Sequence, residues 1–179
     1  DVALKVIRPE LANKPGVLDR FKQEIILARQ VTHRNVIRIF DLGTADGTKF
    51  ITMEFIEGQV LKNLLRERGK YSPEDAADLM MAVAEGLDAA HREKVIHRDL
   101  KPQNIMVDTQ GRALVMDFGL ADVAAGTEGA AQSGSPMGTP DYMSPEQVRC
   151  EDIDARSDVF TMGVILYELL TGKLPFNAP

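Results

Sequence analysis

The spacing of apolar and polar positions predicts strands in the first third of the chain. Residues 2–7 are short, apolar and β-branched, which favours a strand that Pro9 ends. From residue 17 to about residue 31 the apolar positions recur at helical spacing. Two further strand-like runs cover residues 36–41 and 49–55. The turn residues between these two runs are Gly43, Asp46 and Gly47. The expected order is therefore strand, helix, strand, strand.

Helices dominate after Glu57-Gly58, where the pattern breaks. Residues 61–68 predict a short helix closed by Gly69. A longer helix is expected to begin with Ser72 as N-cap and Pro73 in its first turn, and to continue to about Arg92. The inner face of this helix is predicted to consist of Leu79, Val83, Leu87 and Ala90.

The last part of the chain combines short strands, a loop and an apolar helix. Strand-like runs lie at 105–107 and 113–116, with Gly111 in the turn between them. Residues 123–138 are rich in Ala, Gly and Ser without periodicity, which predicts a loop. A strongly apolar helix is expected over 157–171, ending at Gly172.

Composition narrows the class of protein only slightly. The chain has 179 residues, 44% of them apolar, which is enough for a sizeable core. Its net charge of −6 argues against a nucleic-acid partner, because such proteins usually carry a basic surplus. Cys150 is the single cysteine, so no intramolecular disulfide can form, which favours a reducing, cytoplasmic compartment. No apolar run reaches the roughly 20 residues that span a bilayer.

Two short motifs concentrate the candidate chemistry. His97-Arg98-Asp99-Leu100-Lys101-Pro102-Gln103-Asn104 is followed by Asp117-Phe118-Gly119. Each pattern also occurs by chance in ordinary turns. Lys5 in an apolar strand and Glu24 on a helix could equally be ordinary solvated side chains without a role in catalysis. Only their common order and spacing are specific.

In that order and spacing the motifs resemble those of eukaryotic-type serine/threonine protein kinases. The segments 20–24 and 141–147 are similar to the bacterial members. The resemblance implies an α+β, two-lobed kinase fold in partial form. Residues 1–56 would be the remnant of the N-lobe and the hinge, and residues 57–179 a C-lobe without its last helices.

The resemblance also assigns catalytic roles to Lys5, Glu24, Asp99, Lys101 and Asn104, and ATP and metal binding to Asp117. Lys101 would lie beside the γ-phosphate and the attacking hydroxyl. Lys5 would hold the α- and β-phosphates of ATP, and Glu24, 19 residues later (24 − 5), would pair with Lys5. Asp99 would accept the proton of the substrate hydroxyl. Asn104 and Asp117 would bind Mg²⁺, with Mn²⁺ as an alternative.

Other matched positions concern substrate class and structure. Lys101 resembles the lysine of the serine/threonine branch, and Thr139 the threonine that shapes the site for the residue after the phosphoacceptor. Ser144-Pro145-Glu146 stands where the family usually has Ala-Pro-Glu. The resemblance gives structural roles to His97, Phe118, Glu146 and Asp158.

The adenine pocket is assigned more loosely. Ala3 would form its roof and Met106 its floor, with Met53 as gatekeeper and the backbone at Glu54 and Ile56 bonding the base. Core packing is the alternative for both methionines.

Regulation is expected to involve Arg98, which precedes Asp99. A phosphate on the loop between Asp117 and Glu146 would pair with Arg98 and order the segment. Ser133 is the favoured phosphosite and Ser135 the second, ahead of Thr127, although each could be an unmodified loop residue. A second copy of the kinase is the expected partner for autophosphorylation.

The glycine-rich loop of the family would precede Lys5, so we expect the sequence to be truncated at both ends and weakly active by itself. The expected partners are ATP and proteins with Ser or Thr acceptors, and any membrane contact would require segments outside this sequence. An inactive, pseudokinase-like scaffold is the alternative. A tyrosine or small-molecule kinase is a third hypothesis, and Lys101 and the Gly138-Thr139-Pro140 segment argue against tyrosine.

Overall fold

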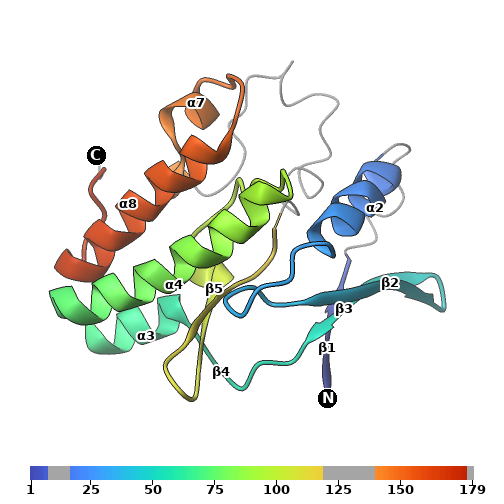
Figure 1. Ribbon diagram of the computed structural model, residues 1–179, viewed down its shortest axis with the longest axis horizontal. Helices are drawn as coiled ribbons and strands as arrows, with labels where there is room; N and C mark the ends of the chain where they lie inside the picture. The colour runs from blue at the N-terminus through green and yellow to red at the C-terminus, as the bar shows by residue number, and fades with distance from the viewer. Residues whose placement is uncertain (8–16, 119–139, 177–179) are drawn as a thin grey trace.

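The computed structural model describes residues 1–7, 17–118 and 140–176. Its elements form a sheet with one flanking helix and a mainly helical part with a second sheet (Figure 1). In chain order the first group has β1 (Val2–Val6), α2 (Val17–Ala28), β2 (Ile39–Ala45) and β3 (Thr48–Glu54). The second group has β4 (Gly58–Val60), α3 (Leu61–Arg68), α4 (Pro73–Arg92), η1 (Pro102–Asn104), β5 (Ile105–Asp108), β6 (Ala113–Val115), η2 (Pro140–Tyr142), α7 (Pro145–Val148) and α8 (Ala155–Thr171).

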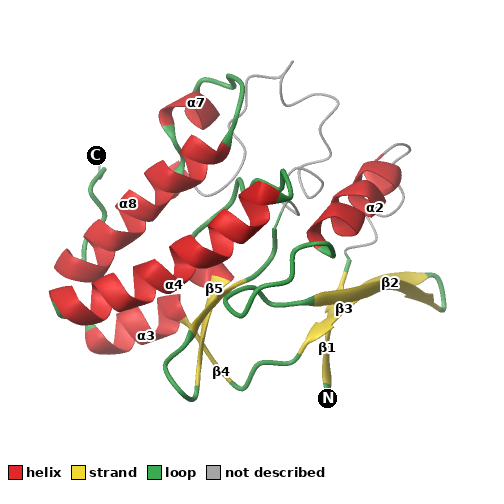
Figure 2. Cartoon of the chain, in the orientation of Figure 1, coloured by secondary structure: helices red, strands yellow, loops and turns green. Residues whose placement is uncertain are grey.

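The first sheet is antiparallel, with strand order β1-β3-β2. Lys5 lies opposite Ile51, whose side chain is fully buried, and Ala3 lies opposite Met53. Helix α2 packs against β2 and buries Ile25 and Ala28, as its periodicity predicted. Strand β1, which carries Lys5, is an edge strand of this sheet and pairs with β3 (Figure 2).

The turn of the β2–β3 hairpin is shorter than the sequence suggested. We expected Gly43 to belong to the turn, but it lies within β2, opposite Phe50. A Cβ at residue 43 would come within 2.5 Å of the Phe50 ring, so a larger residue there would require this ring to move. The turn itself uses Asp46 and Gly47, whose φ angles are 48° and 76°. Both residue types tolerate this left-handed conformation.

Helix α4 is the centre of the helical part, packed between β6 and α8. The Ser72 hydroxyl caps it by accepting a hydrogen bond from the Asp75 N–H at 3.1 Å. The predicted inner face is buried throughout. Gly69 and Gly172 close α3 and α8 with positive φ, as predicted.

Four short elements were not predicted from the sequence: β4, η1, η2 and α7. Strand β4 was interpreted as a break because of Gly58, yet it pairs with β5, and a Cβ at residue 58 would meet the Val107 carbonyl oxygen at 2.2 Å. Helix α7 has only four residues, too few to show a period. In addition, α8 begins at Ala155, two residues before the predicted start, because Asp154 is its N-cap.

A loop segment joins the two groups of elements. The Ile37 N–H donates to the Val115 carbonyl, and the Val115 N–H donates to the Asn35 carbonyl, at 2.9 and 2.8 Å. Strand β6 is thereby fixed next to the chain that enters β2. Among the described helices, none combines the length and apolar character required to cross a membrane. The predicted loop 123–138 lies outside the described residues.

Candidate active site

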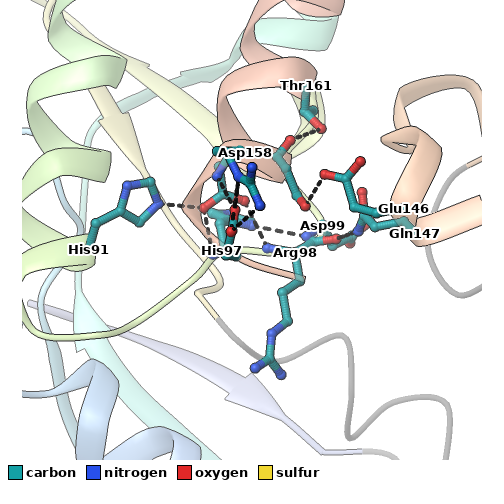
Figure 3. A network of polar contacts seen from close by, with 11 residues as sticks. His91, His97, Arg98, Asp99, Glu146, Gln147, Asp158 and Thr161 are labelled. Atoms are coloured by element: carbon teal, nitrogen blue, oxygen red, sulfur yellow. Dashed lines mark hydrogen bonds and ion pairs between the residues drawn. The ribbon is translucent and has the colours of Figure 1, made fainter. Parts of the chain in front are cut away.

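Residues 97–104, which carry the first motif, are called the catalytic loop below. Asp158 holds the backbone of this loop from inside the protein (Figure 3). It lies in the first turn of α8 and is 1% exposed. One carboxylate oxygen accepts hydrogen bonds from the His97 N–H at 2.9 Å and the His91 ring at 2.7 Å. The other accepts from the Arg98 N–H at 3.1 Å. Burial by itself raises the pKa of Asp158, but the His91 hydrogen bond and the backbone donors outweigh it, so that the pKa is lowered.

The backbone of Arg98 is held in an uncommon conformation. Its φ angle is 65°, in the left-handed region that costs a long side chain about 1 kcal/mol or more. Asp158 fixes its N–H, and the Gln147 side-chain amide donates to its carbonyl at 2.6 Å. Figure 3 shows the guanidinium pointing away from these backbone contacts. The strain is therefore compensated on both sides of the residue that precedes Asp99.

Asp99, Lys101 and Asn104 form one polar cluster. The Lys101 ammonium lies 2.6 Å from the Asp99 carboxylate. The Asn104 amide donates to the Asp99 backbone carbonyl at 2.8 Å, while its Nδ2 is 3.4 Å from the carboxylate. These contacts aim the Asp99 side chain, because its backbone and its carboxylate are both held. The sequence motif is thus confirmed as a compact cluster of three polar side chains.

Asp117 joins this cluster to the first sheet. Its carboxylate Oδ2 lies 2.6 Å from Lys5 Nζ, and its φ angle of 68° is again in the left-handed region. Its second oxygen, Oδ1, is buried and has no hydrogen-bond partner among the described residues. The N–H of Met116, the residue before Asp117, donates to the Asn104 carbonyl at 2.9 Å. An unpartnered carboxylate oxygen near an amide side chain is a set of oxygen donors that suits a hard divalent cation. The residues present therefore fit a metal completed by phosphate and water oxygens.

Lys5 and Glu24 do not pair with each other, contrary to the expectation from the sequence. Lys5 contacts Asp117, and the Glu24 carboxylate lies 3.7 Å from the Arg98 guanidinium. Glu24 Oε2 is buried without a hydrogen-bond partner in the described part of the chain. Burial raises the pKa of Glu24, and the nearby Arg98 charge only partly opposes this. The predicted Lys5–Glu24 pair is therefore wrong for this structure, in which each residue has a different partner.

The catalytic-loop residue His97 packs against Phe118, the residue that follows Asp117. The His97 ring is fully buried and lies 4.9 Å from the Phe118 ring, centroid to centroid. Its Nε2 is 2.9 Å from the Met116 carbonyl oxygen. Because a carbonyl only accepts, this nitrogen carries the proton. The structural roles expected for His97 and Phe118 agree with this packing.

Glu146 and the residues before it attach the far end of the Asp117–Glu146 segment to α8. The Ser157 hydroxyl donates a short hydrogen bond to Glu146, and this contact lowers the pKa of Glu146. The Tyr142 hydroxyl donates to buried Glu168 at 2.6 Å, and Glu168 also pairs with Lys62 at 3.0 Å. Burial, then Glu168, raises the pKa of Tyr142. The segment is thus firmly held on its C-terminal side.

The residues assigned to the adenine pocket come from both groups of elements. Ala3 and Met53 are register partners on β1 and β3, and Met53 is buried. Glu54 ends β3, and its N–H donates to the Arg38 carbonyl at 2.9 Å. Ile56 and Met106 are partly buried and pack against the core. Both methionines therefore take part in packing, whether or not they also contact a base.

Four candidate residues lie outside the described residues: Thr127, Ser133, Ser135 and Thr139. The sequence analysis missed two residues with polar contacts here: Gln147, which contacts the catalytic loop, and His91, which contacts Asp158. Gln147 had a readable signal, because Ser144-x-x-Gln147 is a capping-box pattern. His91 had none, since its contact with Asp158 spans 67 residues.

Two antiparallel sheets and a mainly helical part, with the strand residue Lys5 paired with Asp117 and the loop residue Asp99 paired with Lys101, define a partial two-lobed kinase fold. A search against protein-family models matches the protein kinase domain over residues 1–179. The chain belongs to the protein kinase domain family.

Curated relatives agree with this assignment. The chain is 39% identical, over 98% of its length, to a probable serine/threonine-protein kinase, CPE1738, of Clostridium perfringens. It is 37% identical, over 98%, to serine/threonine-protein kinase PknB of Mycobacterium leprae, and 36% identical, over 99%, to serine/threonine-protein kinase PrkC of Bacillus subtilis. The matches cover 26%, 29% and 27% of these relatives, so the chain spans less than a third of their length.

Proposed function

We propose that the protein is an ATP-dependent protein kinase that phosphorylates serine and threonine. The observation that carries the proposal is the convergence of Lys5, Asp117 and the Asp99–Lys101–Asn104 cluster, with an unpartnered buried oxygen on Asp117. A scaffold without activity has no need to keep these side chains together. The names of the relatives support the same activity.

Asp99 is the proposed base for the acceptor hydroxyl. Held by the Asn104 amide and paired with Lys101, its carboxylate is fixed in a position to orient the hydroxyl and accept its proton. Lys101 also provides a positive charge beside the position of the transferred phosphoryl group. Both effects favour the transition state, because phosphoryl transfer depends on positioning and on neutralised charge.

Asp117 and Asn104 are the proposed ligands of a divalent cation, with Mg²⁺ preferred over Mn²⁺. When bound, the cation would neutralise charge that develops on the phosphate oxygens. Lys5 is the proposed partner of the phosphates of ATP, and it is 43% exposed, so an incoming anion can reach it. Ala3, Met53, Glu54, Ile56 and Met106 are the proposed adenine contacts, and Thr139 the proposed contact for the residue after the acceptor.

Control by phosphorylation is the regulatory part of the proposal. In this structure the Glu24 carboxylate lies 3.7 Å from the Arg98 guanidinium, while Lys5 is paired with Asp117. A phosphate at Ser133 or Ser135 would compete for Arg98, because its charge exceeds that of one carboxylate. Glu24 would then be released to pair with Lys5. A second copy of the protein is the proposed partner for this autophosphorylation.

The organisation of the chain is also a proposal. Residues 1–56 contain the complete first sheet with α2, and residues 57–179 contain the second sheet and the other helices, which supports a division near residue 56. Cytoplasmic localisation of this region agrees with its single cysteine.

The test is phosphotransfer by the full-length protein with radiolabelled ATP and a general protein acceptor, followed by phosphoamino-acid analysis. We expect phosphoserine and phosphothreonine, and a loss of about a thousandfold or more in the Asp99→Asn variant. Asp152→Asn, at an exposed aspartate before α8, is the matched control. Labelled phosphotyrosine alone, or equal rates for both variants, would contradict the proposal.

A further inference from the structure

Gln147 is the one polar side chain of α7 that reaches the catalytic loop. It lies in the last turn of this four-residue helix and is 8% exposed. Its Nε2 lies 2.6 Å from the Arg98 carbonyl oxygen, across 49 residues of sequence. Its Oε1 accepts from the Ser144 N–H at 2.9 Å. Neither contact is needed for the chemistry directly, so its role has to be structural or indirect.

The orientation of the Gln147 amide is fixed by its two neighbours. The Ser144 N–H can only donate and the Arg98 carbonyl can only accept. A flipped amide would therefore place two donors together at one end and two acceptors at the other. The side chain thus has a single orientation that satisfies both contacts.

The Arg98 peptide is the place where such a contact matters most. Arg98 has a φ angle of 65° and directly precedes the proposed base Asp99. Asp158 holds the N–H side of Arg98, and Gln147 holds its carbonyl, which belongs to the peptide group joining Arg98 to Asp99 (Figure 3). Loss of the second contact would free this peptide to rotate toward a more favourable φ. The Asp99 carboxylate would move with it.

We propose that Gln147 is a positioning residue for phosphotransfer, which fixes the Arg98–Asp99 peptide and couples it to the anchored end of the Asp117–Glu146 segment. The coupling is direct, because Tyr142 and Glu146 attach the same end to α8. Any change that displaces α7 is thereby transmitted to Asp99. This inference rests on the proposed function, since it assigns an effect on the catalytic step.

Gln147→Glu is the informative substitution. The shape of the side chain and the acceptor for the Ser144 N–H remain, and glutamate is a good partner in a capping box. The ionised carboxylate cannot donate to the Arg98 carbonyl and repels it. Once protonated, the carboxyl can donate again, and burial raises the pKa of the introduced group. The defect should therefore be relieved by acid.

The experiment measures kcat and KM of the full-length protein with a general protein acceptor, together with binding of a fluorescent ATP analogue and the melting temperature. For Gln147→Glu we expect kcat about tenfold lower at about pH 8, a change of about 1.4 kcal/mol in the barrier, with nucleotide affinity unchanged. The ratio of variant to wild-type kcat should rise as the pH falls to about 6. Gln110→Glu, in the exposed β5–β6 turn, is the control for added charge.

Gln147→Met supplies the second variant. It keeps the length of the side chain but can neither donate nor titrate, so kcat should fall without any recovery at low pH. A folded Gln147→Glu or Gln147→Met protein with wild-type kcat overturns the positioning role. Equal recovery of both variants at low pH would also overturn it. Absence of phosphotransfer by the wild-type protein would instead refute the proposed function, so the two failures are distinguishable.

Discussion

The two sides of the candidate active site differ in how firmly they are held. On the helical side, Asp158 is buried and accepts three hydrogen bonds from the catalytic loop and His91. On the sheet side, Lys5 is 43% exposed, and Glu24 has a 3.7 Å contact and an unpartnered oxygen. Asp99, the proposed base, is thus part of a network of fixed contacts, whereas Lys5 and Glu24, the proposed phosphate ligand and its expected partner, are held less firmly.

In the proposed function, this difference separates the residues that carry the chemistry from those that regulate it. A base must be positioned precisely at all times, because small displacements are costly in rate. A lysine–glutamate pair that can be broken provides a switch, since its state depends on where α2 lies. The pKa shifts agree with this division: that of Asp158 is lowered by its partners, and that of Glu24 is raised by burial.

Removal of the charge of Asp158 should have the largest effect. Asp158→Asn leaves an amide N–H facing backbone donors, so we expect the free energy of unfolding to fall by about 3 kcal/mol or more. Phosphotransfer should fall with it, because the His97–Arg98 backbone loses its support. Urea denaturation and kcat measure the two effects. Asp154→Asn is the matched control on the same helix, since asparagine is also a good N-cap. Equal stability of the two variants would show that the hydrogen bonds of Asp158 do not stabilise this side of the site.

Substitution at Glu24 should affect activity rather than stability. We expect Glu24→Gln to lower kcat/KM about tenfold, equivalent to about 1.4 kcal/mol, if the released glutamate must pair with Lys5. The melting temperature should not decrease, because the buried, unpartnered oxygen is a cost in the ionised form. Kinetics and thermal melting on the same preparations test this. A variant with full activity and a lower melting temperature would reverse the assignment.

Removing the N-cap of α4, which is remote from both sides of the candidate active site, should lower stability by a smaller amount and leave activity unchanged. Ser72→Ala removes the acceptor for the Asp75 N–H at the start of α4 and should cost about 1 kcal/mol. Because Ser72 lies at the opposite end of α4 from His91, kcat should stay at the wild-type value. Denaturation and steady-state kinetics distinguish the two quantities. A large loss of kcat would mean that the start of α4 also helps to position the catalytic loop.

The smallest expected effect concerns pH. The folded protein holds the Glu24 proton more tightly than the unfolded chain, so stability from this group falls as the pH rises from the ordinary value of 4.5 toward the raised pKa. Glu24→Gln should remove this loss, and its advantage over the wild type should grow across that window. The contribution of Asp158 has the opposite sign: it is complete above 3.8 and is lost as the pH falls through the lowered pKa. Unfolding measured at several pH values checks both slopes.

Local patterns in the sequence predicted most of the secondary structure. The caps at Ser72, Gly69 and Gly172 act through nearest neighbours, and the periodicity of α4 follows from one buried face. The predictions failed where a distant residue decides. Gly43 belongs to a strand because of the Phe50 ring, and Gly58 because β5 approaches closely.

The sequence by itself determined the family, the fold class and the identity of the candidate catalytic residues, because motif order and spacing are properties of the chain. Only the tertiary structure decided which groups meet. The pairing of Lys5 with Asp117, of Glu24 with Arg98, and of Gln147 with the Arg98 carbonyl joins residues far apart in sequence. Each of these charged or polar groups has several chemically suitable partners, and packing of the helices and strands selects one of them.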